Sequence, residues 1–396
     1  MTPSAPTVRD TRIDVIRALI LLSIFINHVP QNPLEVLTHK NFGFSDAAEA
    51  FVLISGLSAG MAYGSKFRPG TALAATLKAW RRAGVLYIAQ LCTTLFTLAS
   101  FGFFAALWAR PDLMEKIAIG PVMEHPAEAF AGIVLMTHQL GYNNILSIYV
   151  VMLLMLPPMI LIGRRSISAM LGLSFTLWLG CGLMRIGPPN WPMEGIWFLN
   201  PLSWQFLFFI GVGAMLHIRA GGTLPRHPAL IALAALYLIL SLLWVRIPLW
   251  GVDVSFDLPK VLTGFNKTFL STVRLLHVLA AAYLIVVLAP VSRLLRRRFD
   301  NPLAVMGRHA LPVFIAGTIL AMILQPLRMV AEPGPVLDAL LVLGGCALLF
   351  GLVYWLEFVG RVKQRTAKPM PDKPLADEGS MVARSPSPSR AKERIA

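Results

Sequence analysis

The sequence predicts an all-α integral membrane protein: a bundle of about ten transmembrane helices with both chain ends in the cytoplasm. Three observations support this prediction. Of the 396 residues, 56% are hydrophobic and only 14% are charged, whereas about a quarter of the residues in a soluble domain are charged. Apolar runs long enough to cross a bilayer occur along the whole chain. Lysine and arginine gather between alternate runs, as they do in cytoplasmic loops.

The net charge of +15 does not indicate a nucleic-acid-binding protein, because the basic residues form short clusters between apolar runs. The three cysteines, Cys92, Cys181 and Cys346, each lie inside an apolar run and form no C-x-x-C pair. The sequence therefore predicts neither a disulfide framework nor a metal site. The chain length suits a single membrane domain, since each span with its loop takes roughly 30 to 40 residues.

The first apolar run follows basic residues but ends in Asn27-His28-Val29-Pro30, without the small residues of a signal-peptidase site. We therefore expect a retained helix. The runs predicted to span are 12–30, 46–65, 83–109, 144–163, 167–186, 198–218, 229–249, 269–290, 303–325 and 336–359. The apolar stretch 127–139 is too short to cross, which indicates a re-entrant or interfacial segment. Counting it as a span would raise the number by one.

The basic residues predict the orientation, because they are retained on the cytoplasmic side of short loops. An N-in, C-in topology places most of them there, including Lys66, Arg68, Lys78, Arg81, Arg82, Arg164, Arg165, Arg219, Arg226, Arg293 and Arg296-Arg297-Arg298. The predicted domains are a cytoplasmic N-terminus at 1–11, a transmembrane domain at 12–360 and a basic cytoplasmic tail at 361–396. The tail is expected to be disordered, because it is rich in Pro, Ser, Lys and Arg.

Ionisable side chains inside the predicted spans cost several kcal/mol unless they are paired or hydrated, so each is a candidate functional residue. The helix directions place them in two layers. The layer near the cytoplasmic face contains Asp14, Arg17, Arg308 and His309. The layer near the periplasmic face contains His28, Asp46, Glu49, Arg274 and His277. A polar path across the membrane is expected to join the two layers.

Helical spacing places several of these residues together. Arg17 and His28 are separated by about three turns, so they share one helix face and differ in height by about 16 Å. Asp14 lies three residues before Arg17, close enough for an ion pair that lowers the cost of both charges. The same spacing pairs Asp46 with Glu49 and Arg274 with His277.

Several short motifs stand in a specific order between residues 12 and 360. They are Arg12-x-Asp14-x-x-Arg17, Asn27-His28-Val29-Pro30-x-Asn32-Pro33, Asn41-Phe-Gly-Phe-Ser-Asp-Ala-Ala-Glu49, Ser55-Gly56, Asn200-Pro-Leu-Ser-Trp-Gln205, Leu275-Leu276-His277 and Gly307-Arg308-His309. In this order they resemble the OpgC family of osmoregulated periplasmic glucan succinyltransferases. The spacing of Arg17 and His28 also resembles that of the wider family 3 membrane acyltransferases, which modify lipopolysaccharide, peptidoglycan and other glycans.

The resemblance implies an acyltransferase of the bacterial inner membrane, in contact with the lipid bilayer. Its donor would be cytoplasmic acyl-CoA, with succinyl-CoA as the specific expectation, and its acceptor a hydroxyl of a periplasmic glucan. No permanently bound cofactor and no nucleic acid are expected. The resemblance also implies that His28 lies at the reaction centre. Acetyl transfer to another envelope polysaccharide is the nearest alternative.

For His28 the interpretation as a catalytic base competes with that of an interfacial residue at the end of its helix. A carboxylate bonded to one ring nitrogen would fix the tautomer and leave the other nitrogen as the base. Glu49 and Asp46 are the candidates for this role. Asp46, which follows Ser45, is equally suited to complement the dipole in the first turn of its helix.

Arg17 suits a phosphate or the thioester carbonyl of acyl-CoA, although an arginine near a helix end also snorkels to the interface. Arg308 suits the phosphates of CoA, and Arg274 suits a succinyl carboxylate, with structural pairing as the alternative for both. His277 and His309 are assigned to the substrate site. The alternative for both is a hydrogen bond between helices.

Two other classes of function compete with acyl transfer. Buried acidic, basic and histidine side chains also build the proton relays of secondary transporters. That class predicts internal repeats and paired broken helices, which the sequence does not display. A structural membrane subunit does not account for three ion-pair spacings inside the hydrocarbon. Both a direct transfer and a route through an acylated His28 are compatible with the sequence.

Overall fold

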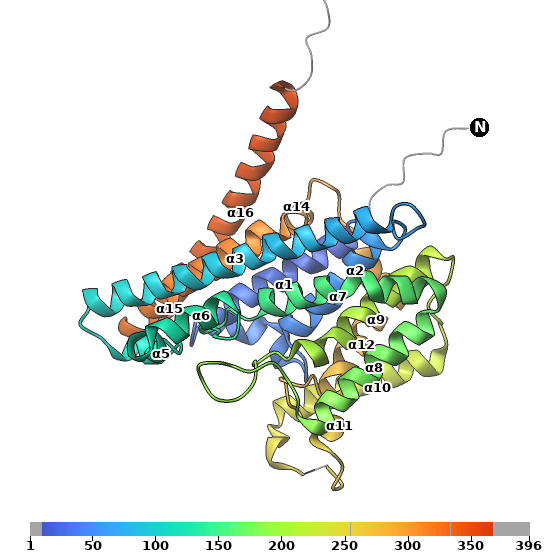
Figure 1. The fold of residues 1–396 in the computed structure, drawn as a ribbon, viewed down its shortest axis with the longest axis horizontal. Helices are drawn as coiled ribbons and strands as arrows, with labels where there is room; N and C mark the ends of the chain where they lie inside the picture. Colours follow the sequence, from blue (N-terminus) through green and yellow to red (C-terminus); the bar gives the residue numbers. More distant parts are fainter. Residues whose placement is uncertain (1–9, 254, 333, 367–396) are drawn as a thin grey trace, which may run out of the picture. The chain divides into compact units, whose positions relative to one another are not determined.

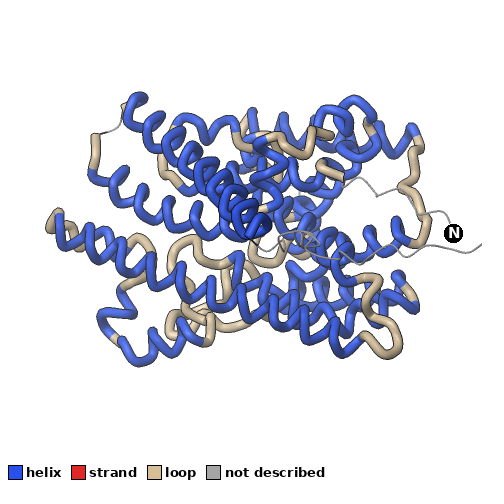
Figure 2. The backbone as a smooth tube through the Cα atoms, turned by 90° about the horizontal axis from the view of Figure 1, so that it is seen from above, coloured by secondary structure: helices blue, strands red, loops and turns tan. Residues whose placement is uncertain are grey.

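The computed structural model describes residues 10–253, 255–332 and 334–366. Within these ranges the chain is helical, and the β-type pairing is a single isolated bridge between Pro189 and Ile196 (Figure 2). The all-α prediction is therefore confirmed. The chain divides after Val353 into two compact units. The second unit is described only as the last turns of a helix, and the following paragraphs concern the first.

Every predicted apolar run coincides with one helix or with two consecutive helices (Figure 1). The long helices are α1 (Arg12–His28), α2 (Ala47–Tyr63), α3 (Ala72–Leu107), α7 (Ile145–Arg165), α8 (Ile167–Met184), α9 (Pro201–Arg219), α10 (Pro228–Arg246), α12 (Thr272–Val287), α15 (Ala310–Val330) and α16 (Pro335–Thr366). Shorter helices join them: α4 (Asp112–Glu115), α5 (Gly120–Glu124), α6 (Pro126–Val134), α11 (Lys260–Thr263), α13 (Ala289–Leu295) and α14 (Pro302–Arg308). Three 3₁₀ turns complete the described chain: η1 (Pro33–Leu37), η2 (His39–Asn41) and η3 (Leu249–Gly251).

Seven of the described helices are long and apolar enough to cross a membrane, namely α3, α7, α8, α9, α10, α15 and α16. The pair α12 and α13 adds an eighth if the two, bent by 87° at their junction, form one span. Helices α1 and α2 have 17 residues each, and α1 also carries Arg12, Asp14 and Arg17. The number of about ten spans and the N-in, C-in orientation remain predictions.

Two predicted boundaries are wrong. Helix α3 begins at Ala72, well before the predicted residue 83, so Lys78, Arg81 and Arg82 lie on the helix and not in a loop. Alanine, leucine, lysine and arginine are good helix formers, and the helix continues through them although the apolar run does not.

The run 303–325 was predicted as one helix but is broken at His309 into α14 and α15. Pro312, in the first turn of α15, explains the break. It has no N–H to offer the carbonyl of Arg308, and its ring would collide with that carbonyl in a continuous helix. The short stretch 127–139 contains the nine-residue helix α6, which ends at Val134.

The two predicted terminal segments lie largely outside the described residues. Most of the N-terminal segment 1–11 lies outside the described residues, and so does the tail from residue 367 onward. Helix α16 continues to Thr366, beyond the predicted end of the membrane domain at residue 360.

Helices α2 and α9 approach each other so closely that their backbones touch. A Cβ atom built on Gly56 would lie 2.0 Å from the carbonyl oxygen of Phe208, and one on Gly211 would lie 2.5 Å from that of Leu53. Small residues permit this type of contact between membrane helices. A third close approach joins α14 to α1, since a Cβ on Gly307 would lie 1.8 Å from the carbonyl oxygen of Asp14.

We expect reporter fusions after Gly70, Arg165, Arg226 and Arg298 to report a cytoplasmic location, because the basic loops are retained there. Fusions after Glu115 and Asp257 serve as controls and should report the periplasm. Paired alkaline phosphatase and fluorescent protein fusions measure this in whole cells. A periplasmic signal at any of the first four positions would overturn the predicted topology.

Candidate functional site

Five of the nine predicted site residues line two separate cavities that share helix α1. Arg17, in the first half of α1, lines one cavity of about 470 Å³. His28, the last residue of α1, lines another of about 400 Å³. We call them the Arg17 cavity and the His28 cavity. Both volumes fall within the usual range of small-molecule sites, about 300–1,000 Å³.

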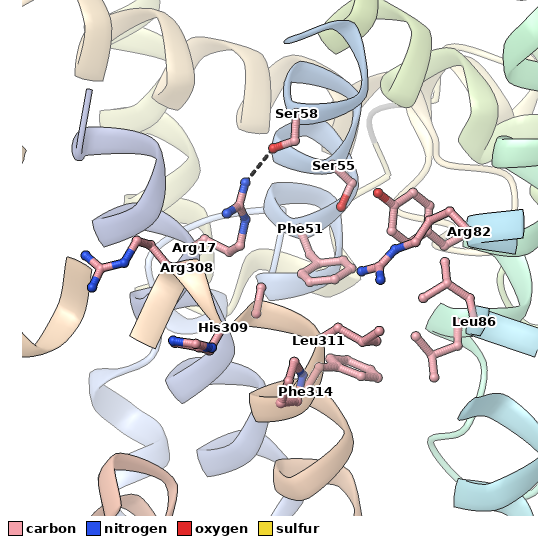
Figure 3. Close-up of a pocket in the computed structure, with 14 residues that line it drawn as sticks. Arg17, Phe51, Ser55, Ser58, Arg82, Leu86, Arg308, His309, Leu311 and Phe314 are labelled. Atoms are coloured by element: carbon pink, nitrogen blue, oxygen red, sulfur yellow. Dashed lines mark hydrogen bonds between the residues drawn. The ribbon is translucent and has the colours of Figure 1, made fainter. Parts of the chain in front are cut away.

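In the Arg17 cavity, the guanidinium of Arg17 is held by three partners. Nη1 donates to Asp14 Oδ1 at 3.2 Å and to the carbonyl oxygen of Gly307 at 3.0 Å. Nη2 donates to Ser58 Oγ at 2.5 Å (Figure 3). The ion pair predicted between Asp14 and Arg17 is therefore confirmed. Asp14 is buried behind Arg17 and does not line the cavity.

Arg308 and His309 also line the Arg17 cavity, at the break between α14 and α15. The guanidinium of Arg308 donates to the carbonyl oxygen of Phe299 at 2.6 Å and lies 3.8 Å from the centre of that ring. Figure 3 shows it pointing away from Phe51 and Arg82. In this conformation Arg308 does not project into the cavity, as a ligand for CoA phosphates would.

The sequence did not identify Arg82 as a site residue, because it was predicted to lie in a loop. It projects from α3 into the Arg17 cavity, and Phe51 lies between it and Arg17 in Figure 3. Ser55, Ser58 and Tyr149 add hydroxyl groups to the lining. The cavity thus presents two cations from different helices together with neutral hydrogen-bonding groups.

In the His28 cavity, the imidazole of His28 is positioned by an aromatic ring. It stacks on Tyr142, with ring centroids 4.4 Å apart and planes 13° from parallel. Gln325 Nε2 donates to the backbone oxygen of His28 at 2.9 Å. Nδ1 of His28 is buried and has no hydrogen-bond partner within the described chain.

The prediction that Asp46 or Glu49 bonds to His28 is wrong in this structure, because other groups occupy both carboxylates. Glu49 accepts from Arg274 Nε at 2.6 Å and from the backbone N–H of Asp46 at 2.9 Å. Asp46 accepts from Lys267 Nζ at 2.5 Å, from Arg274 Nη2 at 3.1 Å and from the N–H of Ala48 at 2.8 Å. Bonds between charged groups are roughly twice as strong as neutral ones, so the cations outcompete an imidazole.

Asp46 and Glu49 form a capping box at the start of α2. Asp46 is the N-cap residue of α2, a position close to the first-turn position that was its alternative role. Asp46 also lines the His28 cavity. Glu49 is completely buried behind the cavity wall. Arg274 joins both carboxylates from α12, so its structural pairing is observed directly.

His277 does not reach either cavity. Its Nδ1 lies 2.7 Å from Ser45 Oγ, and the backbone N–H of Ser45 donates to the same nitrogen at 3.3 Å. Arg274 and His277, predicted as a pair, therefore bind different partners. His277 therefore forms a structural hydrogen bond, although not between two helices, because Ser45 lies in the segment before α2.

Three further residues of the His28 cavity come from the connections between long helices and were not identified from the sequence: Tyr142, Lys40 and Lys267. Lys267 forms an ion pair with Asp46, and Lys40 forms one with Glu35. Burial lowers the pKa of the Lys40 ammonium group. No sequence pattern linked these loops to His28, since their positions depend on the tertiary fold.

The same helices, α2 and α7, line both cavities, and the residues that they contribute to the two cavities lie within about one helical turn of each other. On α2, Ala48 lines the His28 cavity and Phe51 lines the Arg17 cavity. On α7, the adjacent residues Ile145 and Leu146 line the His28 and Arg17 cavities, respectively. One turn of helix rises about 5.4 Å, so a short apolar wall separates the two cavities.

Searches of curated proteins and of solved structures returned no significant match. The family comparison did return a match, and it covers every residue that lines the two cavities. Residues 9–361 match the family model described as OpgC protein, so this chain belongs to the OpgC family.

Proposed function

We propose that this protein is a membrane acyltransferase that moves a succinyl group from cytoplasmic succinyl-CoA to a hydroxyl of a periplasmic glucan. The observation that carries the proposal is the pair of polar cavities on one face of α1, separated by about one helical turn. One cavity offers cations suited to an acyl-CoA donor, and the other offers an imidazole suited to a hydroxyl acceptor. Membership of the OpgC family supports the same type of reaction.

In the proposed complex, the Arg17 cavity receives the donor. Arg17 is fixed by Asp14, Ser58 and the carbonyl oxygen of Gly307, and so presents a defined plane of N–H groups. A guanidinium in a fixed plane is suited to bind phosphate oxygens or to polarise a carbonyl. Arg82 supplies a second positive charge on the opposite side. The pantetheine arm would carry the thioester from this cavity toward His28.

At the His28 cavity, a ring nitrogen of His28 takes the proton from an acceptor hydroxyl as its oxygen attacks the thioester carbonyl carbon. The new C–O ester bond forms, the C–S bond breaks, and the CoA thiolate receives the proton from the imidazolium. In the alternative route, the acyl group first bonds to a nitrogen of His28 and the hydroxyl then displaces it. Stacking on Tyr142 holds the imidazole in a defined orientation for either route.

The proposal is tested with the purified full-length protein in lipid nanodiscs, supplied with succinyl-CoA and a neutral periplasmic glucan. We expect free CoA thiol to be released, together with a glucan that carries negative charge and the mass of succinyl groups. Anion exchange and mass spectrometry measure both changes. Acetyl-CoA in a parallel reaction would reveal acetyl transfer as a neutral mass shift.

In this assay we expect Arg17→Lys to lower the rate about tenfold or more. Lysine keeps the charge but loses the fork that binds three partners, and a lost charged hydrogen bond is worth about 1.5 kcal/mol or more. Arg110→Lys, in an exposed ion pair with Asp112, is the matched control. No acylation of any glycan by the parent protein would contradict the proposed function. Full activity of Arg17→Lys would contradict only the role of Arg17.

A further inference from the structure

A third cavity, of about 440 Å³, adjoins the His28 cavity. Its polar lining consists mainly of carboxamides, contributed by Gln139, Asn144, Asn190 and Asn266. We call it the amide cavity. It shares Tyr142, Asn144 and Phe198 with the His28 cavity, so these side chains lie between two adjacent cavities.

The chemistry of the amide cavity suits a neutral ligand with many hydroxyl groups. A carboxamide offers both donors and acceptors, and a sugar hydroxyl is also both, so the two complement each other without any net charge. Among the described residues that line the cavity there is no carboxylate, and the one cation, Arg185, lies over the ring of Phe269 at 5.3 Å. Charged ligands such as acyl-CoA therefore find little electrostatic complement here.

One of the carboxamides has unused hydrogen-bonding capacity. Gln139 Oε1 is buried and has no hydrogen-bond partner within the described chain. Buried polar atoms are nearly always satisfied, so a turn of the Gln139 side chain toward the cavity would let a ligand or water complete this oxygen. Asn266 Oδ1, in contrast, is occupied by the backbone N–H of Phe269 at 3.0 Å.

Two large aromatic rings lie exposed at the boundary between the amide and His28 cavities. Tyr142 is 51% exposed and Phe198 is 54% exposed. Such rings provide flat apolar faces of the kind that pack against the C–H face of a pyranose. The ring of Tyr142 also stacks on His28 at 4.4 Å, so a ligand that touches Tyr142 lies one aromatic ring away from the imidazole.

We propose that the amide cavity is a carbohydrate subsite, which binds a glucose unit next to the unit that is acylated at His28. This inference rests on the proposed function for the identity of the acceptor. The subsite would hold the glycan through the carboxamides and through stacking on Phe198 and Tyr142. It positions one hydroxyl at the imidazole and so contributes to acceptor affinity, without a chemical role in the transfer.

Two substitutions test the subsite in the nanodisc-embedded protein, with a neutral β-linked glucotetraose as the probe. We expect Phe198→Ala and Asn190→Ala each to raise the KM for the oligosaccharide about tenfold, the size of one stacking contact or one hydrogen bond. The KM for succinyl-CoA should not change, because the donor binds elsewhere. Phe198→Tyr, which keeps the ring, should restore the parental KM.

Phe256→Ala is the matched control, since this 85% exposed aromatic ring does not line the amide cavity. Saturation-transfer NMR measures binding of the oligosaccharide independently of acyl transfer. Binding that both variants weaken supports the subsite even if the parent transfers no acyl group. The subsite is overturned if both variants bind the oligosaccharide as well as the parent does. It is also overturned if the parent does not bind the oligosaccharide at millimolar concentration. Neither of these last two results bears on the donor cavity.

Discussion

His28→Gln is expected to leave a folded, membrane-inserted protein that has lost acyl transfer by about 10²- to 10⁴-fold, the usual size of a general-base contribution. Glutamine keeps a polar group at the end of α1 but offers no nitrogen that takes up a proton. The backbone bond from Gln325 to residue 28 does not involve the side chain and should persist. Succinyl content of the glucan, measured by mass spectrometry at equal protein abundance, reports the loss.

The matched control is His125→Gln, since this exposed histidine lines neither the Arg17 cavity nor the His28 cavity. It should retain the activity of the parent. Tyr142→Leu provides a second comparison, because it removes the ring that stacks on His28 while the imidazole remains. Full acylation by the His28→Gln protein would remove His28 from the reaction centre.

Arg274→Met is expected to have the largest effect on stability, lowering the free energy of unfolding by about 3–5 kcal/mol. Arg274 donates to both Glu49 and Asp46, and its side chain is only 13% exposed. Without it, the fully buried carboxyl group of Glu49 loses the cation that it bonds in this structure. Breaking one side of a buried ion pair costs more than the pair itself contributes, because the remaining charge is left desolvated. Titration with a denaturing detergent measures the change.

Two variants give this prediction its controls. Arg274→Met combined with Glu49→Gln removes the stranded charge and should recover part of the lost stability. Arg110→Met breaks the exposed ion pair with Asp112 and should change the free energy of unfolding far less, because solvent screens exposed charges. Equal losses for Arg274→Met and Arg110→Met would show that the buried ion pairs contribute little to the fold.

Local geometry explains what the sequence predicted correctly. Long apolar runs identified the helices because a bilayer requires about 20 apolar residues for each span. The ion pair of Asp14 with Arg17 and the shared face of Arg17 and His28 follow from helical periodicity alone. Membership of the OpgC family was predicted from short motifs in a specific order, and the match of residues 9–361 to the family model confirms it.

Contacts between distant segments were the part that the sequence did not predict. Arg274 and Glu49 lie 225 residues apart, and no periodicity connects them. The carboxylates were therefore assigned to His28, whereas the fold gives them to Arg274 and Lys267. Tyr142, which positions His28, lies in a loop whose path depends on tertiary packing. The same limit applies to the buried pair of Arg328 and Asp338, which joins α15 to α16.

The contact of Gly56 and Gly211 with the opposing backbones has a mechanical consequence. No side chain lies between α2 and α9 at these points, so neither helix slides past the other without a collision. The contact therefore favours movement of α2 and α9 together as one unit. Since α2 carries Ala48 at one cavity and Ser55 at the other, a tilt that widens one cavity displaces the wall of the second. A movement of this helix pair would therefore change the walls of the Arg17 cavity and the His28 cavity together.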